Sequence, residues 1–554
     1  MLRVAARGWR VFRSIFKHLA VPWMLRRAAP PRAKRMQALL EELGGLWVKL
    51  GQALALRFDI LPADYCLQFF QLLNRMEPFA ANDVRAVIEG ELGRPVETLF
   101  RSFEWEPHAA ASIGQVHRAE LPDGTAVAVK VQRPRIRDLV RADLAIMRCV
   151  AWFIDRLRLA GRPQAGALVE EFARWTDEEL DFRIEARHAT VLRRNAEDDP
   201  LERNPRVYPD YTTARILTVE YFAGVPVIDI VLATRARDTA VLATLAARGH
   251  DPRRIAAHLV WNALNQIYRF GYFHADPHPA NLIVLENDAI GYVDFGIVGK
   301  LDDETTRSLR YFAQSLFAGH TGKAVDEFMK FLSPSGRTNI AAARRDLIEA
   351  MNNYVESARV GPEGIAWTED IFEIEMLSVV RAHGMALRPD AVRYLKAVLT
   401  AEAMVKELDP QFDLRAYENR FFGRLMELEA VESIDPRRLA QRVVDARVRF
   451  DRVLEAIESL SETPRDLLRI SLTVRRRVLF LATLMAVGWA AVLVAVQLAS
   501  GWPELRLLSS PLTIIAAIGA LVSVGLLWFS ILEVRRLPSE SQAGGWSHYP
   551  RRMR

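Results

Sequence analysis

Two carboxylates and an amide lie where short apolar segments begin or end. Residues 273–284 read FHADPHPANLIV, so a polar loop with Asp276 and Asn281 runs directly into an apolar strand. Residues 290–296 read IGYVDFG, a second short strand that ends in Asp294 and a glycine. Oxygen ligands at the ends of adjacent strands can converge on Mg²⁺ and leave a third group near a reacting phosphate. The pattern favours metal-assisted phosphate chemistry.

His274, Asp276 and His278 occur at alternate positions of the same loop, a spacing that can also bind a transition metal. This alternative is weaker, because the neighbouring sequence supplies no further nitrogen or sulfur ligand and because Asn281 and Asp294 would have no role. We expect His278 only to shape the loop.

Lys130 is the one charge in a strand of sequence VAVKV. Residues 109–119 lead through the turn Pro122-Asp123-Gly124 into this strand, which predicts a β-hairpin. A lysine is costly to bury without a partner, so Lys130 indicates a phosphate or carboxylate nearby. An edge-strand lysine that points to water explains the same segment equally well.

The elements around these residues follow from apolar periodicity. Residues 41–105 are predicted to be helical, with a periodic face from Leu39 to Leu54 that includes the sequence KLGQ at 49–52. Residues 216–221 are predicted to form another strand. Asp251 and Pro252 have the residue types of a helix cap and first turn, and the helix they start ends at Gly271.

Read together, these segments resemble the protein-kinase fold, and within it the UbiB-like atypical kinases, called ADCK proteins in animals. Between residues 41 and 310 the matching motifs are a KxGQ motif (Lys49–Gln52), an alanine-rich loop (Ala109–Ser112), VAVK (Val127–Lys130), an ExD motif (Glu179–Asp181), HADPHPAN (His274–Asn281) and DFG (Asp294–Gly296).

The resemblance implies a role for each matching residue. Lys130 would contact the α- and β-phosphates of ATP and pair with Glu185, on the helix that also bears Glu179 and Asp181, with Glu179 as the other possible partner. Asp276 would orient the attacking water or hydroxyl, while Asn281 and Asp294 would hold Mg²⁺. The remaining nucleotide-binding positions would be a loop over the phosphates (Ala109, Ala111, Ser112, Gly114 and Val116) and a hinge beside adenine (Glu220 and Tyr221).

Lys49 is expected to approach the ExD acids and the catalytic loop, where its helix would exclude a bulky peptide. Ala109 and Ala111 stand where kinases keep glycines, and no Ala-Pro-Glu follows Asp294-Phe295-Gly296. Both features argue against protein phosphorylation. They leave slow ATP hydrolysis or phosphorylation of a small molecule or lipid.

Charge is concentrated at the two ends of the 554-residue chain. Residues 1–40 carry ten Lys or Arg and no acid, and residues 533–554 carry five Arg and two Glu. The net charges of these two segments are +10 and +3. Subtracting them from the net charge of the whole chain, +6, leaves about −7 for residues 41–532. This distribution argues against a nucleic-acid partner and favours ends that lie near anionic lipids. The two cysteines exclude a disulfide framework.

Residues 478–499 and 512–532 contain no charge, and each is long enough to cross a bilayer as a helix. Arg475, Arg476 and Arg477 precede this hairpin and Arg535 and Arg536 follow it, which predicts that residues before 478 face the cytosol. Residues 3–19 have apolar side chains at helical spacing among arginines, as in a helix lying on a membrane. A solvated basic helix is an equal alternative, and a mitochondrial presequence a weaker one.

We therefore expect an α+β, two-lobed protein-kinase-like fold with an N-terminal helical extension and a C-terminal two-helix transmembrane hairpin. The expected parts are a basic arm (1–40), the KxGQ extension (41–105), an N-lobe with a helical insertion (106–223), a helical C-lobe (224–470), the hairpin (478–532) and a basic cytosolic tail (533–554).

The resemblance implies an ATP- and Mg²⁺-dependent accessory factor of ubiquinone biosynthesis in the bacterial inner membrane, or in the mitochondrial one. Its partners would be isoprenoid quinone precursors and other quinone-biosynthesis enzymes. A nucleotide-binding pseudokinase scaffold and a small-molecule or lipid kinase are the alternatives.

Overall fold

The computed structural model describes residues 2–20, 31–55, 57, 59–69, 71, 72, 78–110, 113–156, 165–336, 338–357 and 369–433. The chain divides into two compact units, Met1–Met426 and Glu427–Arg554, and both lobes of the fold belong to the first. The two predicted spans, 478–499 and 512–532, lie outside the described residues. Within the described ranges, no helix has both the length and the apolar character needed to cross a membrane.

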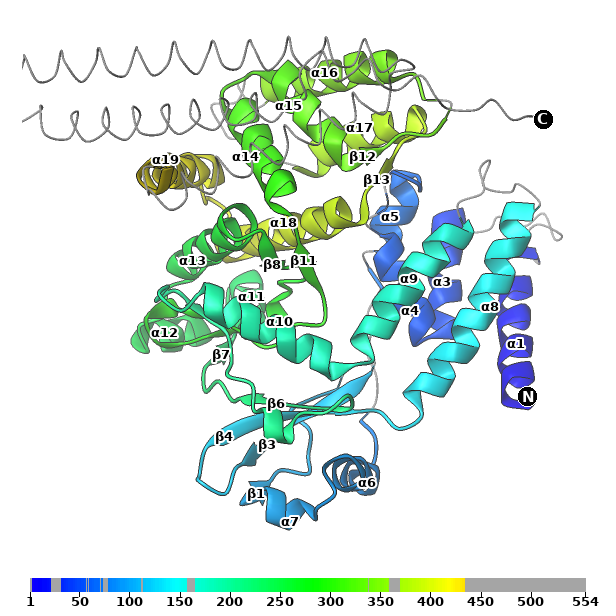
Figure 1. Cartoon of the computed structure of the whole chain (residues 1–554), viewed down its shortest axis with the longest axis vertical. Helices are drawn as coiled ribbons and strands as arrows, with labels where there is room; N and C mark the ends of the chain where they lie inside the picture. Colours follow the sequence, from blue (N-terminus) through cyan, green and yellow to red (C-terminus); the bar gives the residue numbers. More distant parts are fainter. Residues whose placement is uncertain are drawn as a thin grey trace, which may run out of the picture. The chain divides into compact units, whose positions relative to one another are not determined.

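A five-stranded antiparallel sheet forms the small lobe in the described part of the chain (Figure 1). Its order is β1-β3-β4-β6, with β2 paired to β3. The predicted hairpin is β3 and β4, and in its turn the Asp123 carboxylate accepts a hydrogen bond from the Thr125 amide. The strands are β1 (Ser102–Phe103), β2 (Ala109–Ala110), β3 (Gly114–Glu120), β4 (Ala126–Gln132) and β6 (Ile216–Glu220).

Alternation along β4 gives the sheet two different faces. Val127, Val129 and Val131 are fully buried and pack with α6 (Ala81–Leu92) and α7 (Val96–Leu99). Because successive strand residues point to opposite faces, Lys130 projects from the other side of the sheet. The core valines therefore fix the direction in which this lysine points.

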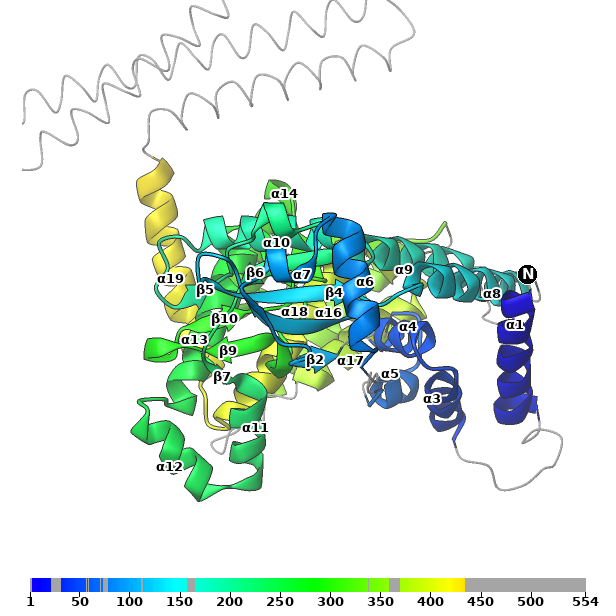
Figure 2. The same cartoon turned by 90° about the horizontal axis from the view of Figure 1, so that it is seen from below.

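The predicted periodic helix from Leu39 to Leu54 is two helices. Gly44 and Gly45 both have positive φ, which ends α3 (Arg32–Leu43) and starts α4 (Leu46–Leu54) in a new direction. With α5 (Ala63–Phe69), α8 (Ile136–Arg156) and α9 (Ala165–Glu179), these helices share one apolar core, to which Val11 also belongs. Figure 2 shows these helices beside the sheet.

The first described part of the basic arm, residues 2–20, is helical, with α1 (Leu2–Ile15) followed by the π-helical turn η1 (Phe16–Ala20). One face of it packs on the protein, because Arg7 bonds the fully buried Asp143 of α8 at 2.7 Å and Ser14 donates to Glu42 of α3. The choice between a solvated and a lipid-bound outer face therefore stays a prediction. Arg10 and Arg13 remain exposed.

The large lobe contains short sheets surrounded by helices. One sheet has the order β5-β10-β9-β7, with its strands labelled in Figure 2, and β8 pairs separately with β11 (Figure 1). The strands are β5 (Glu202–Arg203), β7 (Val225–Pro226), β8 (Tyr272–His274), β9 (Leu282–Val284), β10 (Ile290–Tyr292), β11 (Val298–Lys300), β12 (Leu332–Ser333) and β13 (Ala386–Leu387).

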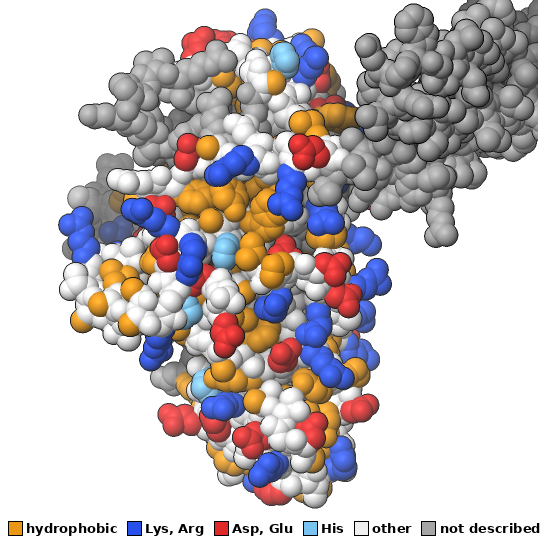
Figure 3. All heavy atoms as spheres, turned by 90° about the vertical axis from the view of Figure 1, so that its left-hand side faces the viewer, with side chains coloured by type: hydrophobic (Ala, Val, Ile, Leu, Met, Phe, Trp, Pro, Cys, Tyr) orange, Lys and Arg blue, Asp and Glu red, His pale blue; other side chains and the backbone are white. Residues whose placement is uncertain are grey.

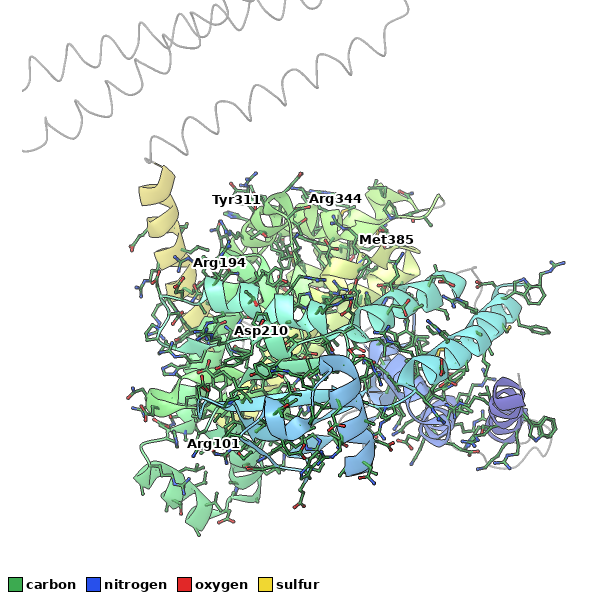
Figure 4. All side chains as sticks on the ribbon, turned by 60° about the horizontal axis from the view of Figure 1, so that its bottom comes forward. Arg101, Arg194, Asp210, Tyr311, Arg344 and Met385 are labelled. Carbon is green, nitrogen blue, oxygen red and sulfur yellow. The ribbon has the colours of Figure 1, made fainter. Side chains whose placement is uncertain are left out.

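Helices α13 and α18 pack against each other, and they contact β10 and β11 respectively. Asp251 caps α13 through the Arg253 amide with Pro252 in the first turn, as predicted. In Figure 4, Arg101 marks the small lobe and Arg344 on α16 marks the large one. The helices of this lobe are α11 (Val227–Ala236), α12 (Thr239–Ala247), α13 (Pro252–Leu264), α14 (Asp303–Phe317), α15 (Thr321–Phe328), α16 (Ile340–Ser357), α17 (Glu369–Ala382) and α18 (Pro389–Leu408). Helix α19 (Leu414–Ser433) begins in the first unit and ends in the second.

Candidate functional site

Lys130 connects three elements that are far apart in the sequence. Its ammonium nitrogen lies 2.7 Å from Glu185 Oε1 on α10 (Phe182–Asn195) and 3.2 Å from Asp294 Oδ2 after β10. Glu185 also accepts a hydrogen bond from the Phe295 amide at 3.3 Å. Strand β4 lies between β3 and β6 and Lys130 is buried, so the alternative of a water-facing edge lysine is wrong.

Lys130 and Asp294 both keep their charge at neutral pH. Burial works against the cation, but the attraction of Asp294 and Glu185 outweighs it and raises the pKa of Lys130. Burial also disfavours the Asp294 carboxylate, yet Lys130 and the Gly296 amide at 2.8 Å lower its pKa to about 2. The site therefore presents an ionised carboxylate beside a cation.

His274 joins the catalytic loop to the segment that contains Asp294. Its Nε2 atom bonds the Asp294 backbone carbonyl, and its Nδ1 atom accepts from the Asp276 amide at 3.2 Å. Burial lowers the pKa of His274, so the neutral ring donates at one nitrogen and accepts at the other. Neither nitrogen is left to bind a transition metal, and His278 uses Nδ1 to accept from the Ala280 amide in the turn η4 (Pro279–Asn281).

Asn281 and Asp294 fit a magnesium site by their chemistry. Asn281 Nδ2 donates to the Asp276 carbonyl at 3.1 Å, and the Asn281 carbonyl accepts from the Val293 amide at 3.0 Å. The side-chain bond leaves Asn281 Oδ1 without a hydrogen bond in the described part of the chain. The backbone bond places Asn281 beside Val293, the residue before Asp294. One amide oxygen and an ionised carboxylate are hard donors of the kind Mg²⁺ takes together with substrate phosphates.

The KxGQ segment brings a second lysine to the site. Lys49, on α4, forms an ion pair with Glu179, the last residue of α9. A Cβ atom at Gly51 would clash with Leu72 and lie 2.7 Å from Leu40, so glycine lets α4 pack closely, and Gln52 bonds the Leu72 carbonyl at 3.0 Å. Burial lowers the pKa of Lys49 to about 8, although Asp294 opposes this shift.

The ExD acids do not share a helix with Glu185, contrary to the expectation. Glu179 ends α9, whereas Asp181 caps α10 by accepting from the Arg183 amide at 3.1 Å. The Asp181 carboxylate pairs with the Arg183 guanidinium at 2.7 Å. Lys130 therefore pairs with Glu185, Lys49 pairs with Glu179, and Asp181 shapes the turn between the two helices.

The structure places only some of the residues predicted for the phosphate-covering loop close to Lys130. Ala109 pairs with Val116 across β2 and β3, and Val116 lies opposite Lys130 on β4. A Cβ atom at Gly114 would lie 2.5 Å from the Val131 carbonyl, so this glycine permits close pairing of β3 and β4. Ala111 and Ser112 lie outside the described residues.

At the end of β6, the Glu220 carboxylate contacts two arginines. Its Oε2 atom accepts from the Arg206 amide at 3.1 Å and lies 3.2 Å from the Arg193 guanidinium. Tyr221 lies under Arg118, 4.8 Å from its guanidinium carbon, and beside the His108 ring. The Glu220 carboxylate therefore has partners within the protein and does not need a nucleotide to satisfy its charge.

Sequence reasoning missed Lys396, which lies on α18. Its Nζ atom is 2.9 Å from Asp276 Oδ2. No motif surrounds Lys396, but the chain has nine lysines among 74 basic residues, so the rarity of lysine was a usable signal. The site thus contains three lysines, each paired with a carboxylate, at the place where the two lobes meet.

Comparisons with known proteins match the chain to one family. The ABC1 atypical kinase-like domain family matches residues 71–327. The chain is 32% identical over 425 residues to "Probable protein kinase UbiB" from Marinobacter nauticus, covering 72% of this chain and 70% of the relative. It is 31% identical over 392 residues to "Protein ACTIVITY OF BC1 COMPLEX KINASE 7, chloroplastic" from Arabidopsis thaliana, covering 70% of this chain and 54%, about half, of that relative.

Among solved structures, the protein in "The complex structure of Rv3197-erythromycin from Mycobacterium tuberculosis" aligns with 24% identity and a TM-score of 0.43, over 71% of this chain and 95% of that one. The identity and the coverage of the bacterial relative are sufficient to assign the family. The chain belongs to the UbiB-like family of ABC1 atypical kinases.

Proposed function

We propose that this protein is a membrane-anchored atypical kinase-like ATPase that supports ubiquinone biosynthesis. The observation that carries the proposal is the Lys130 cation held between Glu185 and Asp294, because this arrangement keeps a lysine charged inside the site and an ionised carboxylate next to it. A phosphate group with a divalent cation would match both charges.

In this proposal each residue has a separate task. Lys130 contacts the α- and β-phosphates of ATP, while Asn281 and Asp294 hold Mg²⁺, which would neutralise phosphate charge when bound. Asp276 orients a water molecule at the terminal phosphorus. The water oxygen bonds to phosphorus, the bond to the bridging oxygen of ADP breaks, and the water proton passes by way of Asp276 to the released phosphate or solvent.

The acceptor is proposed to be water or a small hydroxyl rather than a peptide. The Lys49–Glu179 ion pair links α4 to the end of α9, next to the turn before α10, so the KxGQ helix is held close to the catalytic residues. A helix in this position limits the space for a polypeptide substrate.

Membrane attachment is proposed to come from two parts of the chain. The uncharged segments 478–499 and 512–532 would anchor the protein, and α1 would contact anionic lipid through its outward side, where Trp9 is 67% exposed near Arg10 and Arg13. A protein truncated after Thr473 should be extracted by salt and carbonate, and its retention in the membrane would contradict this anchor.

The bacterial inner membrane, with the kinase-like domain in the cytoplasm, is the proposed location, and the mitochondrial inner membrane is the alternative. Isoprenoid quinone precursors and other quinone-biosynthesis enzymes are the proposed partners. On the face in Figure 3, basic and acidic side chains are interspersed among hydrophobic ones.

Complementation of a quinone-deficient strain tests the physiological part of the proposal. Wild-type protein should restore quinone synthesis and Asp276→Asn should not, if turnover is required. Equal restoration by Asp276→Asn would instead support a nucleotide-binding scaffold, and it would contradict the ATPase role.

A further inference from the structure

Lys396 is paired with Asp276, the residue that the proposed function assigns to the attacking water. Its ammonium nitrogen lies 2.9 Å from Asp276 Oδ2, and in the described part of the chain the Asp276 carboxylate has no other ion-pair partner. The loop itself, residues 274–281, contains no lysine or arginine. A cation beside Asp276 therefore has to come from another element, and α18 supplies it.

The position of Lys396 is fixed by its neighbours on α18. Two residues earlier, Tyr394 bonds Tyr268 through their hydroxyl groups at 2.8 Å, and the next residue, Ala397, is buried. One turn earlier, Arg393 lies over the Trp175 ring of α9, the helix that ends in Glu179. The helix thus contacts both the catalytic loop and α9, which carries the partner of Lys49.

The three lysines occupy different parts of the site. Lys130 is held by Glu185 and Asp294, and the proposed function assigns it to the α- and β-phosphates. Asp276 is assigned to the water that attacks the terminal phosphorus. Its partner Lys396 must then lie toward the terminal phosphate, where charge spreads over the equatorial oxygens during transfer.

We propose that Lys396 is a further catalytic residue, which contacts the terminal phosphate of bound ATP and stabilises its charge during transfer. This inference rests on the proposed function. A purely structural role does not explain the pair well, because the Lys396 and Asp276 side chains are 23% and 32% exposed, and ion pairs with this much solvent contact add little to stability.

Nucleotide titration of the full-length protein in detergent tests this assignment. Lys396→Gln removes the cation, Lys396→Arg keeps it, and Lys406→Gln on the same helix is the matched control. We expect Lys396→Gln to weaken the binding of Mg²⁺ with a non-hydrolysable ATP analogue about tenfold and to leave Mg²⁺–ADP binding within about twofold, because ADP lacks the contacted phosphate. Lys396→Arg should recover most of the loss.

The outcomes separate this inference from the proposed function. Equal losses for ADP and the ATP analogue, or no loss for either, would overturn the role of Lys396 while nucleotide binding by the wild-type protein still stands. A wild-type protein that binds neither nucleotide would overturn the proposed function and the role of Lys396 with it. Unchanged melting temperatures of the variants without nucleotide would support a role in binding rather than in folding.

Discussion

The Lys130 ammonium lies 2.7 Å from the Glu185 carboxylate, although 55 residues separate the two in the sequence. Between them the chain forms α8 and α9, which pack on the N-terminal helices rather than on the sheet. The strand lysine and the helix glutamate meet because α10 returns to β6 after this detour. The long insertion therefore leaves the pair intact while it adds the surface that holds the KxGQ helix.

Removing one member of this pair should destabilise the fold. Lys130→Met would leave Glu185 and Asp294 as neighbouring carboxylates without a cation, at a cost of about 2–5 kcal/mol. The double variant Lys130→Met/Glu185→Met should lose less than the sum of the single variants by at least ~1 kcal/mol in urea unfolding. Arg235→Met, in the exposed pair with Glu407, is the control and should change stability by less than about 0.5 kcal/mol. Strict additivity of the two single variants would show that the pair is not coupled.

The metal assignment predicts different effects for neighbouring polar residues. Asn281→Ala and Asp294→Asn each remove a proposed oxygen donor, so both should weaken Mg²⁺-dependent nucleotide binding at least tenfold. His278→Ala removes only the hydrogen bond to the Ala280 amide and should have a much smaller effect. Calorimetric titration with and without Mg²⁺ measures this. Stoichiometric zinc that is lost in the His278 variant would contradict the assignment.

Lys49 should set an alkaline limit for the site. Its pKa is about 8, so the side chain is a cation below that pH and loses its charge above it, which leaves Glu179 uncompensated. Nucleotide binding or turnover should therefore fall as the pH rises through 8. Lys49→Arg stays protonated, and its pH profile should extend at least about one unit higher. If the pH profiles of the wild type and Lys49→Arg fall at the same alkaline pH, a group other than Lys49 sets the limit.

The raised pKa of Glu202 predicts that the stability of the fold depends on pH, whether or not the protein hydrolyses ATP. Burial raises its pKa to about 8 from a usual value near 4.5, and its Oε1 atom accepts from Asn204 and Gln266. The folded chain therefore binds more protons than the unfolded chain between these values, so stability should fall as pH rises from 4.5 to 8.

Glu202→Gln keeps the accepting oxygen and removes the ionisation. It should be more stable than the wild type by about 1–3 kcal/mol at pH 8 and similar to it at pH 4.5, as measured by thermal or urea unfolding. Because Gln266 also accepts from the His274 amide, the substitution should leave the catalytic loop in place. A variant that is less stable at both pH values would show that the carboxyl proton has a structural role.

Local sequence patterns were sufficient to predict the elements next to the site. The Pro-Asp-Gly turn predicted the β3–β4 hairpin, and Asp251 with Pro252 predicted the start of α13. The same kind of signal was present but missed at Asp181, whose residue type favours a helix cap and which divides the predicted single helix into α9 and α10.

Contacts between distant elements could not be derived in this way. Lys396 meets Asp276 because α18 packs beside α13, and nothing in the sequence around either residue encodes that packing. Gly44 and Gly45 were visible in the sequence, but the apolar periodicity on both sides of them favoured one helix. Both glycines have positive φ in the folded chain, and this conformation divides the segment into two helices.

We propose a site for Mg²⁺ and ATP that turns over and that consists of Lys130, Asp276, Asn281 and Asp294. The most direct test is phosphate release from ATP by the purified full-length protein in anionic liposomes, with wild type and Asp294→Asn measured in parallel with and without Mg²⁺. We expect slow, Mg²⁺-dependent release by the wild type and a loss of at least about a hundredfold in Asp294→Asn. Equal release by the two proteins, or release that does not depend on Mg²⁺, would contradict the account.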